Sequence, residues 1–452
     1  DMSSEWSKVL LEDVASEITV GYVGSMTKEY QDDGIPFLRS LNVDRFNINR
    51  NDIRYVSTEF HERISKSRLA PGDVVIVRTG KPGTSAVIPD DLPEANCSDL
   101  VIVRCGNKLN NRFLCYFLNS AATAHIDAHL VGAVQQHFNV GSARVLEINL
   151  PPIEEQEAIA HVLGTLDDKI KLNRKTNETL EDIAKALFKS WFVDFEPVRA
   201  QAEGRPTGLS DEISELFPDS FEETELGEIP SGWNPTCLDD ITDFVIGGDW
   251  GKGEQSNEFP APTLCIRGAD IPDLQDFGYG KMPARFLKES SAQKRSLRHG
   301  DIVFEISGGS PTQSTGRPVL VESQTLEKFR SPLTCSNFCR LVRPLSIAHS
   351  RYIYQHLRQA YDFGEMFMYE TGTTGIKNFG YKHYASSRFF PLPGERLLNA
   401  FSSVIGDLRQ RCHLSGSENS TLASLRDALL PRLISGELRV PDAEKILEEV
   451  GV

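Results

Sequence analysis

The chain has 452 residues, enough for two to four domains and for more than one hydrophobic core. Its 40% hydrophobic and 25% charged residues exclude wholesale disorder, a collagen-like chain and a disulfide scaffold. The formal net charge of -16 argues against a protein that binds nucleic acid by bulk charge alone.

The start of the chain has no basic stretch followed by an apolar core, so we predict no secretory signal. No apolar run approaches the roughly 18 residues that a membrane span needs, and we therefore expect a cytoplasmic protein. The eight cysteines form no CxxC pair, which favours reduced, mostly buried thiols. The spacings of Cys335 with Cys339 and of His125 with His129 are poor metal signals, and we predict no metal site.

The negative charge is concentrated in two segments. Residues 194–228 hold 11 acidic and 2 basic side chains, and residues 437–452 hold 5 and 2. Elsewhere there are basic clusters: residues 281–298 contain six basic residues against one Glu, and residues 45–68 contain six against three acidic ones. Either cluster alone is compatible with an ordinary solvated face, but their similar positions in a repeat favour a functional interpretation.

The chain is a long tandem repeat. The segment that begins at Trp6 recurs at Trp233, an offset of 227 residues. Small insertions then increase the offset, and from Leu150 and its equivalent Leu392 it stays at 242 to the end of each half. A period of this length is far above that of solenoid repeats, so we predict two similar domains rather than a stacked array.

Each half has the same coarse pattern. Short β-like runs, DVVIVR and DLVIVR in the first half and DIVFEI and FCRLVR in the second, are separated by Gly and Pro turns and precede one long helical segment. The predicted fold class is α+β: two similar mixed α/β domains joined by two long helices, which form an antiparallel coiled coil with pseudo-twofold symmetry.

The two helical segments carry heptads, with nine positions each that alternate in steps of three and four. In the first segment these are Leu163, Leu166, Ile170, Asn173, Asn177, Leu180, Ala184, Leu187 and Trp191; in the second they are Ile405, Leu408, Cys412, Ser415, Asn419, Leu422, Arg426, Leu429 and Leu433. A single amphipathic helix packed on its own domain is the alternative. The polar layers favour pairing of the two helices.

Asn177 and Asn419 lie at the middle of their series, so we expect antiparallel pairing to place them opposite each other, where they would fix the register. Parallel pairing would also align them, but pseudo-twofold symmetry requires antiparallel helices. From Leu163 to Trp191 the helix rises about 42 Å. This length is comparable with one turn of duplex DNA, about 34 to 36 Å.

Four stretches resemble a known family. They are LPPIEEQEAIAHVLGTLDDKI at 150–170, LEDIAKALFKSWFVDFEPVRA at 180–200, LFPDSFEETELGEIPSGW at 216–233 and SLRDALLPRLISGEL at 424–438. With these stretches the chain resembles a specificity subunit of a type I restriction-modification enzyme, and the resemblance covers nearly the whole chain.

The resemblance implies a non-catalytic, sequence-specific DNA-binding subunit. Each target recognition domain would read one half of a split target in double-stranded DNA, and the helices would act as spacer and dock two methyltransferase subunits. Restriction subunits would join them. No cofactor would be bound by this chain: S-adenosylmethionine would belong to the methyltransferase subunit, and ATP and Mg to the restriction subunit.

The predicted domain boundaries follow the repeat and the resemblance. They are residues 1–150 for the first target recognition domain, 151–195 for the first spacer helix, 196–228 for an acidic linker, 229–392 for the second recognition domain, 393–437 for the second spacer helix and 438–452 for an acidic C-terminal tail.

The chain shows no catalytic motif of its own. A methyltransferase would need a glycine-rich cofactor loop and an (N/D)PP(Y/F) strand end, which neither Asn149-Leu-Pro-Pro nor Asn234-Pro-Thr-Cys provides. The stretch from Arg78 to Ser85 lacks phosphate-loop spacing, and Pro82 would stop the helix that should face phosphate. No Asp…Glu-x-Lys nuclease cluster stands out.

Base reading needs Arg or Lys for guanine and Asn or Gln for adenine on loops that enter the major groove. Two pairs of stretches qualify, although an ordinary polar turn is the alternative for the first pair. The candidates are Gln135, Gln136, His137 and Asn139 with Lys377, Asn378, Lys382 and His383, and the Gly-rich turns with Arg78 and Lys81 in one half and Gln313 and Arg317 in the other. Because the halves differ at these places, we predict two different half-sites and an asymmetric target.

The basic clusters suit phosphate contact, which positions a protein on DNA without reading sequence. The candidates are Arg50, Arg54, Arg63, Lys66 and Arg68 in the first half and Lys288, Lys294, Arg295 and Arg298 in the second. DNA would repel the acidic segment from Asp194 to Glu228, so we expect it to run away from the duplex and connect the first helix to the second domain.

Two other functions stay open. One is a self-sufficient DNA methyltransferase or endonuclease whose motifs are unrecognised, which binding of S-adenosylmethionine by the isolated chain would favour. The other is a scaffold that assembles proteins without touching DNA, which salt-dependent duplex binding would contradict.

Overall fold

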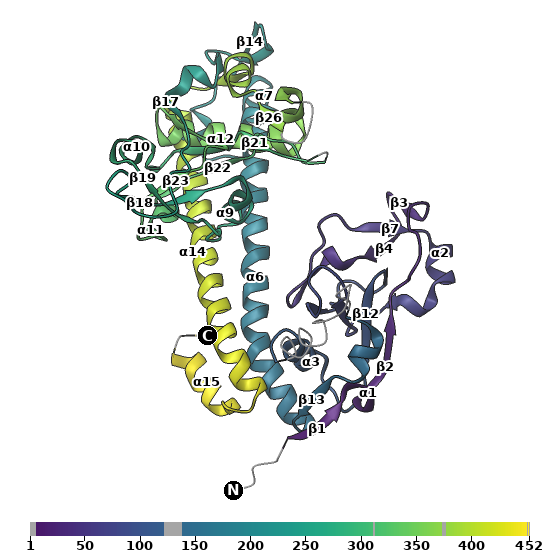
Figure 1. Ribbon diagram of the computed structural model, residues 1–452. Coiled ribbons are helices and arrows are strands. Elements are labelled where there is room, and N and C mark those ends of the chain that lie inside the picture. Colours follow the sequence, from purple (N-terminus) through teal and green to yellow (C-terminus); the bar gives the residue numbers. More distant parts are fainter. Residues whose placement is uncertain (1–5, 122–137, 311, 373–376, 450, 452) are drawn as a thin grey trace. The chain divides into compact units, whose positions relative to one another are not determined.

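The computed structural model describes residues 6–121, 138–310, 312–372, 377–449 and 451, and its chain trace is shown in Figure 1. The chain divides into two compact units. Unit 1 comprises residues 1–170 and 421–452, and unit 2 comprises residues 171–420. Each of the two long helices therefore contributes residues to both units.

Unit 1 contains a four-stranded antiparallel sheet with strand order β10-β9-β12-β2 and a mixed five-stranded sheet with order β3-β7-β4-β11-β8. The strands of the first sheet are β2 (Ala15–Val20), β9 (Val74–Val77), β10 (Ser85–Val87) and β12 (Leu100–Cys105). Those of the second are β3 (Tyr30–Gln31), β4 (Ile35–Leu38), β7 (Arg54–Val56), β8 (Arg68–Leu69) and β11 (Ala95–Cys97). The residues of β9 are all buried, as expected for a run of four β-branched apolar side chains with both faces covered.

The remaining strands of unit 1 form two pairs, β1 (Ser7–Leu10) with β13 (Glu147–Leu150) and β5 (Val43–Asp44) with β6 (Asn47–Ile48). Its short helices are α1 (Leu11–Val14), η1 (Ser40–Asn42), α2 (Thr58–Arg63), η2 (Ser65–Ser67), α3 (Asn111–Leu118) and α5 (Val140–Arg144).

Unit 2 repeats this plan. The four-stranded sheet has the order β22-β20-β24-β17, and β19-β18-β23 corresponds to the middle of the five-stranded sheet. These strands are β17 (Thr242–Gly247), β18 (Ala261–Ile266), β19 (Ala284–Leu287), β20 (Ile302–Glu305), β22 (Pro318–Leu320), β23 (Leu333–Cys335) and β24 (Cys339–Pro344). The pair β16 (Asn234–Cys237) with β27 (Phe389–Leu392) matches β1 with β13. The same strand order in both halves confirms the predicted α+β tandem repeat.

Unit 2 contains further strands and helices. A three-stranded sheet has the order β21-β26-β25, with β21 (Ser307–Gly308), β25 (Glu370–Thr371) and β26 (Lys377–Phe379), and β14 (Phe221–Thr224) forms a hairpin with β15 (Gly227–Pro230). The shorter helices are α7 (Glu196–Ala202), α8 (Asp211–Ser214), η3 (Asp239–Ile241), η4 (Gly268–Asp270), α9 (Ile271–Gln275), α10 (Glu289–Arg295), α11 (Ser323–Glu327), α12 (Ile347–Asp362), η5 (Glu365–Tyr369) and α13 (Tyr381–Ser387).

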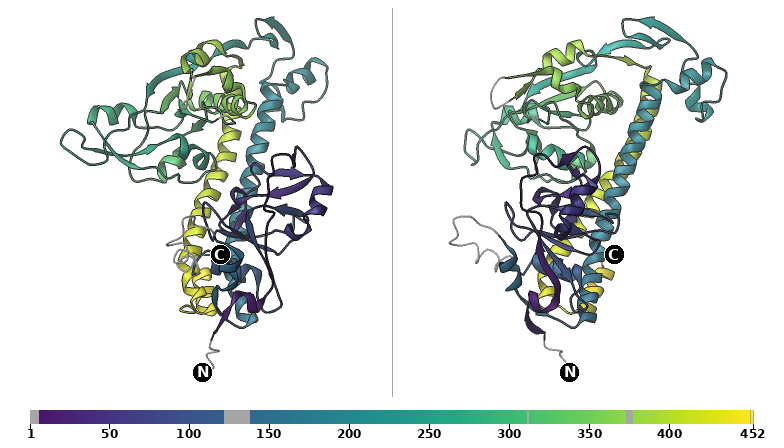
Figure 2. Two further views of the ribbon diagram at one scale, coloured as in Figure 1. Left: turned by 45° about the vertical axis from the view of Figure 1, so that its right-hand side comes forward. Right: turned by 90° about the vertical axis from the view of Figure 1, so that its right-hand side faces the viewer.

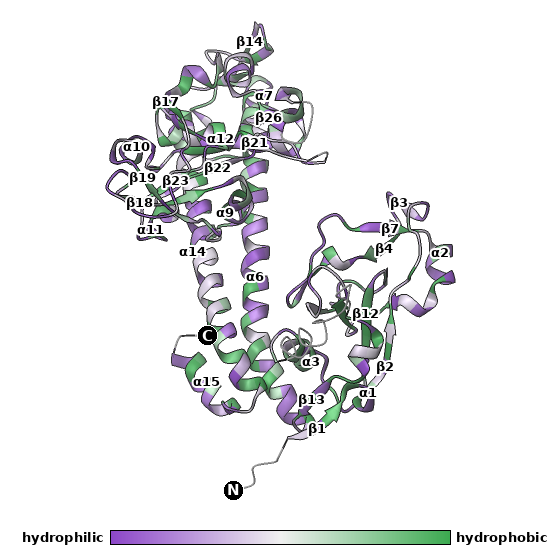
Figure 3. Ribbon diagram, viewed as in Figure 1, coloured by the Kyte–Doolittle hydropathy of each residue, from purple (hydrophilic) through white to green (hydrophobic). Residues whose placement is uncertain are grey.

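Helices α6 (Ile153–Phe192) and α14 (Glu395–Ile434) each contain 40 residues. Within each unit the stretches of α6 and α14 lie side by side (Figure 2). Residues further along α6 contact residues earlier in α14, so the two helices are antiparallel. In unit 2 Glu181 contacts Arg409 while Asn173 contacts Asn419, and in unit 1 Asp167 contacts Arg426. Hydrophilic and hydrophobic residues alternate along both helices (Figure 3), as expected of helices with one buried face. The antiparallel pairing is confirmed within each unit.

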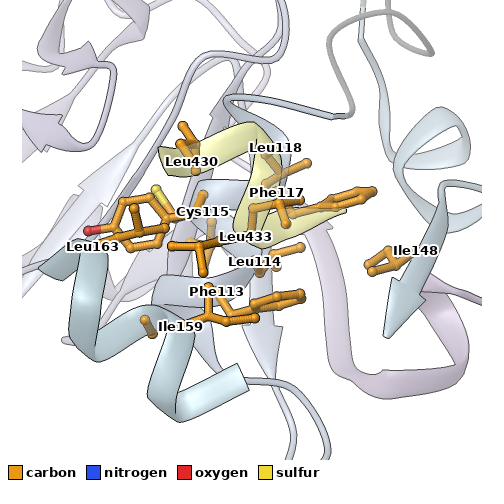
Figure 4. Packing of buried hydrophobic residues seen from close by; sticks show 14 of the residues in the cluster. Phe113, Leu114, Cys115, Phe117, Leu118, Ile148, Ile159, Leu163, Leu430 and Leu433 are labelled. Atoms are coloured by element: carbon orange, nitrogen blue, oxygen red, sulfur yellow. The ribbon is translucent and has the colours of Figure 1, made fainter. Parts of the chain in front are cut away.

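The heptad positions are mostly buried. Leu163, Leu166, Ile170, Leu422 and Leu429 belong to the core of unit 1, and Ile405 belongs to that of unit 2. The positions Leu180, Leu187 and Leu408 are half-buried. Figure 4 shows how Ile159 and Leu163 of α6 and Leu430 and Leu433 of α14 pack against α3 in unit 1.

The predicted register of the helix pair is wrong by one layer. Asn173, not Asn177, faces Asn419: the Asn173 amide nitrogen donates to the Asn419 side-chain oxygen at 3.0 Å. The Asn177 amide donates instead to the backbone carbonyl of Cys412 at 3.1 Å. Each helix carries two adjacent polar heptad positions, Asn173 and Asn177 in α6 and Ser415 and Asn419 in α14. The midpoint of the antiparallel pair falls between these positions in each helix and not on Asn177 and Asn419.

Two segments predicted as linker and tail are folded. In residues 196–228, Val198 is fully buried and Phe217 is 4% exposed in the core of unit 2. The C-terminal segment forms α15 (Val440–Glu449), which buries Ala443 and Leu447 in the core of unit 1. In both cases a few apolar side chains dock the segment while the acidic residues stay on its outer face.

Candidate nucleic-acid interface

Two candidate base-reading residues of unit 1, Arg78 and Lys81, lie in the turn that connects β9 and β10. The Arg78 guanidinium donates to the Asp99 carboxylate at 3.0 Å, and the Thr79 hydroxyl donates to the other oxygen of Asp99 at 2.7 Å. Lys81 is exposed at the tip of the turn. Arg78 is therefore held by an acidic neighbour, and a guanine would have to compete with Asp99 for its donors.

The described end of the second candidate stretch of unit 1, Phe138 and Asn139, lies against this turn. The Phe138 amide donates to the Arg78 carbonyl at 3.1 Å, and Asn139 follows as the N-cap of α5, with its side-chain oxygen accepting from the Ser142 amide. This capping contact occupies the Asn139 oxygen. Gln135, Gln136 and His137 lie outside the described residues, as do His125 and His129.

Unit 2 brings its two candidate stretches together in the same way. The Phe379 amide donates to the Ile306 carbonyl at 2.7 Å, which is the repeat equivalent of the hydrogen bond between Phe138 and Arg78. Strands β21 and β26 lie next to each other (Figure 1). Their register places Ser307 opposite Asn378. Among the described residues, the two candidate stretches of each unit, separate in the sequence, therefore lie next to each other.

The basic candidates on this surface of unit 2 have partners. Lys377 donates to Glu370 at 2.8 Å, and Arg317 donates to the Tyr361 hydroxyl at 2.9 and 3.0 Å. Burial alone would raise the pKa of Glu370, but hydrogen bonds from Lys377 and from Thr315 outweigh it and hold the pKa below its usual value. The Lys377 ammonium is therefore oriented by a carboxylate that stays ionised.

Three further candidates project from unit 2. Gln313 lies exposed in the turn between β21 and β22, and Lys382 and His383 are exposed at the start of α13. The His383 ring lies 5.4 Å from the ring of Tyr369, centroid to centroid. The surface thus combines amide, ammonium, guanidinium and imidazole donors on a sheet and a helix.

The phosphate candidates occupy equivalent regions of the two units, around α2 and α10. In unit 1, Arg50 pairs with Asp91 at 2.5 Å, Arg54 with Asp52 at 3.2 Å and Arg63 with Glu29 at 3.0 Å. In unit 2, Lys288 pairs with Glu258 at 2.6 Å, and Arg295 donates to the Gly247 carbonyl at 2.9 Å. Exposed ion pairs of this kind contribute little, so a phosphate can replace the carboxylate at small cost.

The remaining phosphate candidates differ in exposure. Arg68 is half-buried, and its Nε has no hydrogen-bond partner in the part of the chain that the structure describes. Lys66, Lys294 and Arg298 are exposed, and within the described residues they form no ion pair. These three side chains are available to an anion without loss of an existing contact.

Sequence reasoning missed the residues that hold these basic side chains. Asp99 adopts a left-handed backbone conformation, with φ of 53°, and Tyr361 lies near the end of α12, far from Arg317 in the sequence. No spacing or composition signal links either residue to its partner. They were not predictable because the contacts depend on how the turns fold back.

Cys335 and Cys339 are buried in unit 2, and burial raises the pKa of the Cys339 thiol to about 12. Over the described ranges, no group of three or more His, Cys, Asp or Glu side chains is arranged to hold a metal ion. Among those residues, no helix has the length and apolarity to cross a bilayer.

The chain is similar in sequence to known specificity subunits. A model of the type I restriction modification DNA specificity domain matches residues 3–182. The chain is 25% identical over 336 residues to the type I restriction enzyme HindI specificity subunit of Haemophilus influenzae, which covers 66% of this chain and 70% of that protein. It is 24% identical over 457 residues to the MjaIX specificity subunit of Methanocaldococcus jannaschii, which covers 97% of this chain and 94% of that protein.

A solved structure shows the same fold. The crystal structure of the type I restriction-modification system S subunit from M. genitalium aligns with a TM-score of 0.54 and 15% identity, and covers 96% of this chain and 97% of that chain. Duplicated α+β units on an antiparallel helix pair are thus a fold that this chain shares with that S subunit. The matched specificity-domain model and these relatives confirm the resemblance to specificity subunits of type I restriction-modification enzymes that is seen in the sequence.

Proposed function

We propose that each unit of this specificity subunit reads one half of a split, asymmetric target in double-stranded DNA. The observation that carries this proposal is the pair of equivalent hydrogen bonds of Phe138 and Phe379, which in each unit join the described end of one candidate stretch to the turn that holds the other. Side chains on this surface differ between the units, with Arg78 and Lys81 in one and Gln313 and Arg317 in the other. Different donors at equivalent places favour different half-sites.

We further propose that the paired helices set the spacing and dock two methyltransferase subunits. The stretches of α6 and α14 in unit 2 expose large apolar side chains, with Leu172 at 59%, Ile183 at 48% and Leu414 at 64% exposure. Exposed apolar side chains on a helix pair are typical of a surface that another protein covers. Restriction subunits would join this core. S-adenosylmethionine would be bound by the methyltransferase, and ATP and Mg by the restriction subunit.

Methylation mapping tests the proposal directly. DNA from cells that express this chain with its methyltransferase is compared with DNA from cells that lack this chain. We expect a split, asymmetric motif that disappears without the chain. Methylation of the same motif in both strains would mean that the methyltransferase reads DNA by itself, and would refute the proposal.

Docking needs a separate measurement. Replacing Ile183 and Leu414 with Glu should weaken co-purification of the methyltransferase, because two charges would enter a dry interface. The matched control replaces Lys175, an exposed residue of α6, with Glu. Equal loss in both variants would argue against an apolar docking surface.

A self-sufficient methyltransferase or endonuclease is the second candidate function. Calorimetric titration of the isolated chain with S-adenosylmethionine separates it from the first, since a recognition subunit should give no heat of binding. Saturable binding would favour the second candidate.

A further inference from the structure

One glycine of each long helix lies under an arginine of the same unit. Gly164 in α6 and Gly406 in α14 occupy equivalent positions of the repeat, in the related strings VLGTL and VIGDL. A Cβ on Gly164 would lie 2.5 Å from Nη1 of Arg112, and a Cβ on Gly406 would lie 2.3 Å from Nη1 of Arg351. A glycine inside a helix destabilises it by about 1 kcal/mol relative to alanine. Its presence at the equivalent position of both helices therefore indicates that the close approach of the arginine to the helix has a function.

In unit 1 the arginine joins α3 to the helix pair. Arg112, in the first turn of α3, makes a two-pronged contact with Asp168, with nitrogen to oxygen distances of 3.0 and 3.2 Å. Asp168 lies one turn after Gly164, so the guanidinium crosses the helix surface at the place where the side chain is missing. A two-pronged contact restricts rotation as well as distance.

In unit 2 the equivalent arginine is held more tightly. Arg351 of α12 donates to the carbonyl of Ser402, one turn before Gly406, at 2.7 Å, and to both oxygens of Glu322 at 2.9 and 3.2 Å. Glu322 is 1% exposed and also accepts from Arg409 of α14 at 3.0 Å. We call the sheets and short helices of each unit its recognition globule. In unit 2 the Glu322 carboxylate connects this globule to α14, because it accepts from Arg351 of α12 and from Arg409 of α14.

Each unit has a second contact of the same kind, made by a phenylalanine in a left-handed backbone conformation. Phe46 has φ of 68°, and the guanidinium of Arg426 on α14 lies 4.7 Å from its ring centroid. Arg426 pairs in turn with Asp167 on α6 at 2.6 Å. Arg426 of α14 therefore contacts both the recognition globule, through Phe46, and α6, through Asp167.

The corresponding phenylalanine of unit 2 is Phe277, with φ of 61°, and the guanidinium of Arg409 lies 5.2 Å from its ring centroid. Arg409 pairs with Glu181 on α6 at 3.4 Å. Gly416 of α14 lies directly beneath, and a Cβ there would come within 2.3 Å of the Phe277 carbonyl oxygen. A bulky residue with positive φ is uncommon, and its occurrence at this contact in both units indicates a constrained geometry.

From this duplication we infer that Gly164 with Arg112, and Gly406 with Arg351, are positioning residues: they fix the angle at which each recognition globule is held on its own stretch of the helix pair. Any stabilising contact would serve to keep a globule attached. Both arginines lie over a glycine of a long helix and hydrogen-bond to that helix, Arg112 to Asp168 and Arg351 to the Ser402 carbonyl. This arrangement, repeated at equivalent positions in two diverged halves, serves DNA reading, because the reading surface must enter the groove at a defined angle. The inference rests on the proposed split recognition.

The test measures spacer preference. The methylase complex with Gly164→Ala or Gly406→Ala is assayed on a duplex library that carries both half-sites separated by spacers of different lengths. The added methyl group displaces the arginine, so we expect the preference for the native spacer over spacers one base pair longer or shorter to fall about tenfold. The half-site sequences themselves should stay unchanged.

Controls separate position from stability. Gly394→Ala adds a Cβ that meets nothing within 4 Å, and its spacer preference should equal that of the unaltered chain. Arg112→Lys keeps the charge but loses the two-pronged contact, and it should shift spacer preference while methyltransferase assembly and melting temperature stay near those of the unaltered chain.

Each outcome bears on one statement. An unchanged ranking of spacers in the assembled, folded Gly164→Ala, Gly406→Ala and Arg112→Lys complexes overturns the inference, as does a loss of methylation on all spacers in equal proportion. If the unaltered complex methylates no split motif at all, the proposed function itself fails, and that result is visible before any variant is tested.

Discussion

Replacement of Glu322 with Gln removes the negative charge that Arg351 and Arg409 share in unit 2. The Glu322 and Arg409 side chains are 1% and 3% exposed, so their contact at 3.0 Å is screened little by solvent. Removing one partner of a buried ion pair costs about 3 to 5 kcal/mol, because the remaining charge stays buried without compensation. Glu181 still contacts Arg409, at 3.4 Å, so we expect the lower end, about 3 kcal/mol.

Urea unfolding followed by tryptophan fluorescence measures this loss, because Trp191 and Trp233 are buried in unit 2. Glu327→Gln is the matched control, since that side chain is exposed and forms no ion pair among the described residues; its free energy of unfolding should change by less than about 0.5 kcal/mol. A decrease below about 1 kcal/mol for Glu322→Gln would show that the network is not a buried charge cluster.

Acid gives an independent check of the same carboxylate. Burial by itself raises the pKa of Glu322, but attraction to Arg409 and the hydrogen bond from Arg351 outweigh it and hold the pKa below its usual value of 4.5. A carboxylate with a lowered pKa in the folded state stabilises the protein above pH 4.5, and this contribution decreases as the pH falls further. The Glu322→Gln variant should lack this part of the acid sensitivity.

Three further predictions concern other parts of the chain. Charge reversal at Arg295 and Arg298 should weaken binding to all duplexes alike and flatten its salt dependence, measured by titration at several salt concentrations. Replacement of Gln135 and Gln136 with Ala should relax discrimination in one half-site and leave methyltransferase assembly intact, and an unchanged methylation motif would remove both residues from the reading surface. His413 is 3% exposed, and burial lowers its pKa to about 3, so the free energy of unfolding should fall by about 1.4 kcal/mol per pH unit below 6.5; His413→Leu should lose this dependence.

The architecture was largely predictable from the sequence, since it follows from periodicities that survive in a single chain. The offset of 242 residues in the helices placed Leu163 and Ile405 at equivalent core positions, and both are fully buried. The register was not predictable to one layer. Asn173 and Asn177 are of the same residue type and lie in adjacent layers, so the sequence does not distinguish between them, and the structure places Asn173 opposite Asn419.

The candidate site was predictable as a set of stretches but not as a surface. Residue type singled out Arg78 and Lys377, whereas the partners Asp99 and Glu370 carry no local signal. The equivalence of Gly164 and Gly406, by contrast, is visible in the sequence. It becomes informative only when the structure shows what lies over each glycine.

The charges between the two helices do not follow the repeat. In both units α6 supplies the carboxylate, Asp167 or Glu181, and α14 supplies the arginine, Arg426 or Arg409. Yet the repeat equivalent of Asp167 is Arg409, so the two halves have diverged to opposite charge at one position. Two copies of α6 would bring together the carboxylates without these arginines, whereas α6 with α14 satisfies both pairs. Opposite charges at such positions set partner choice in paired helices. The charges that differ between the two halves therefore favour pairing of α6 with α14 over pairing of two copies of α6. The contacts of Gly164 with Arg112 and of Gly406 with Arg351, by contrast, are at equivalent positions in both halves.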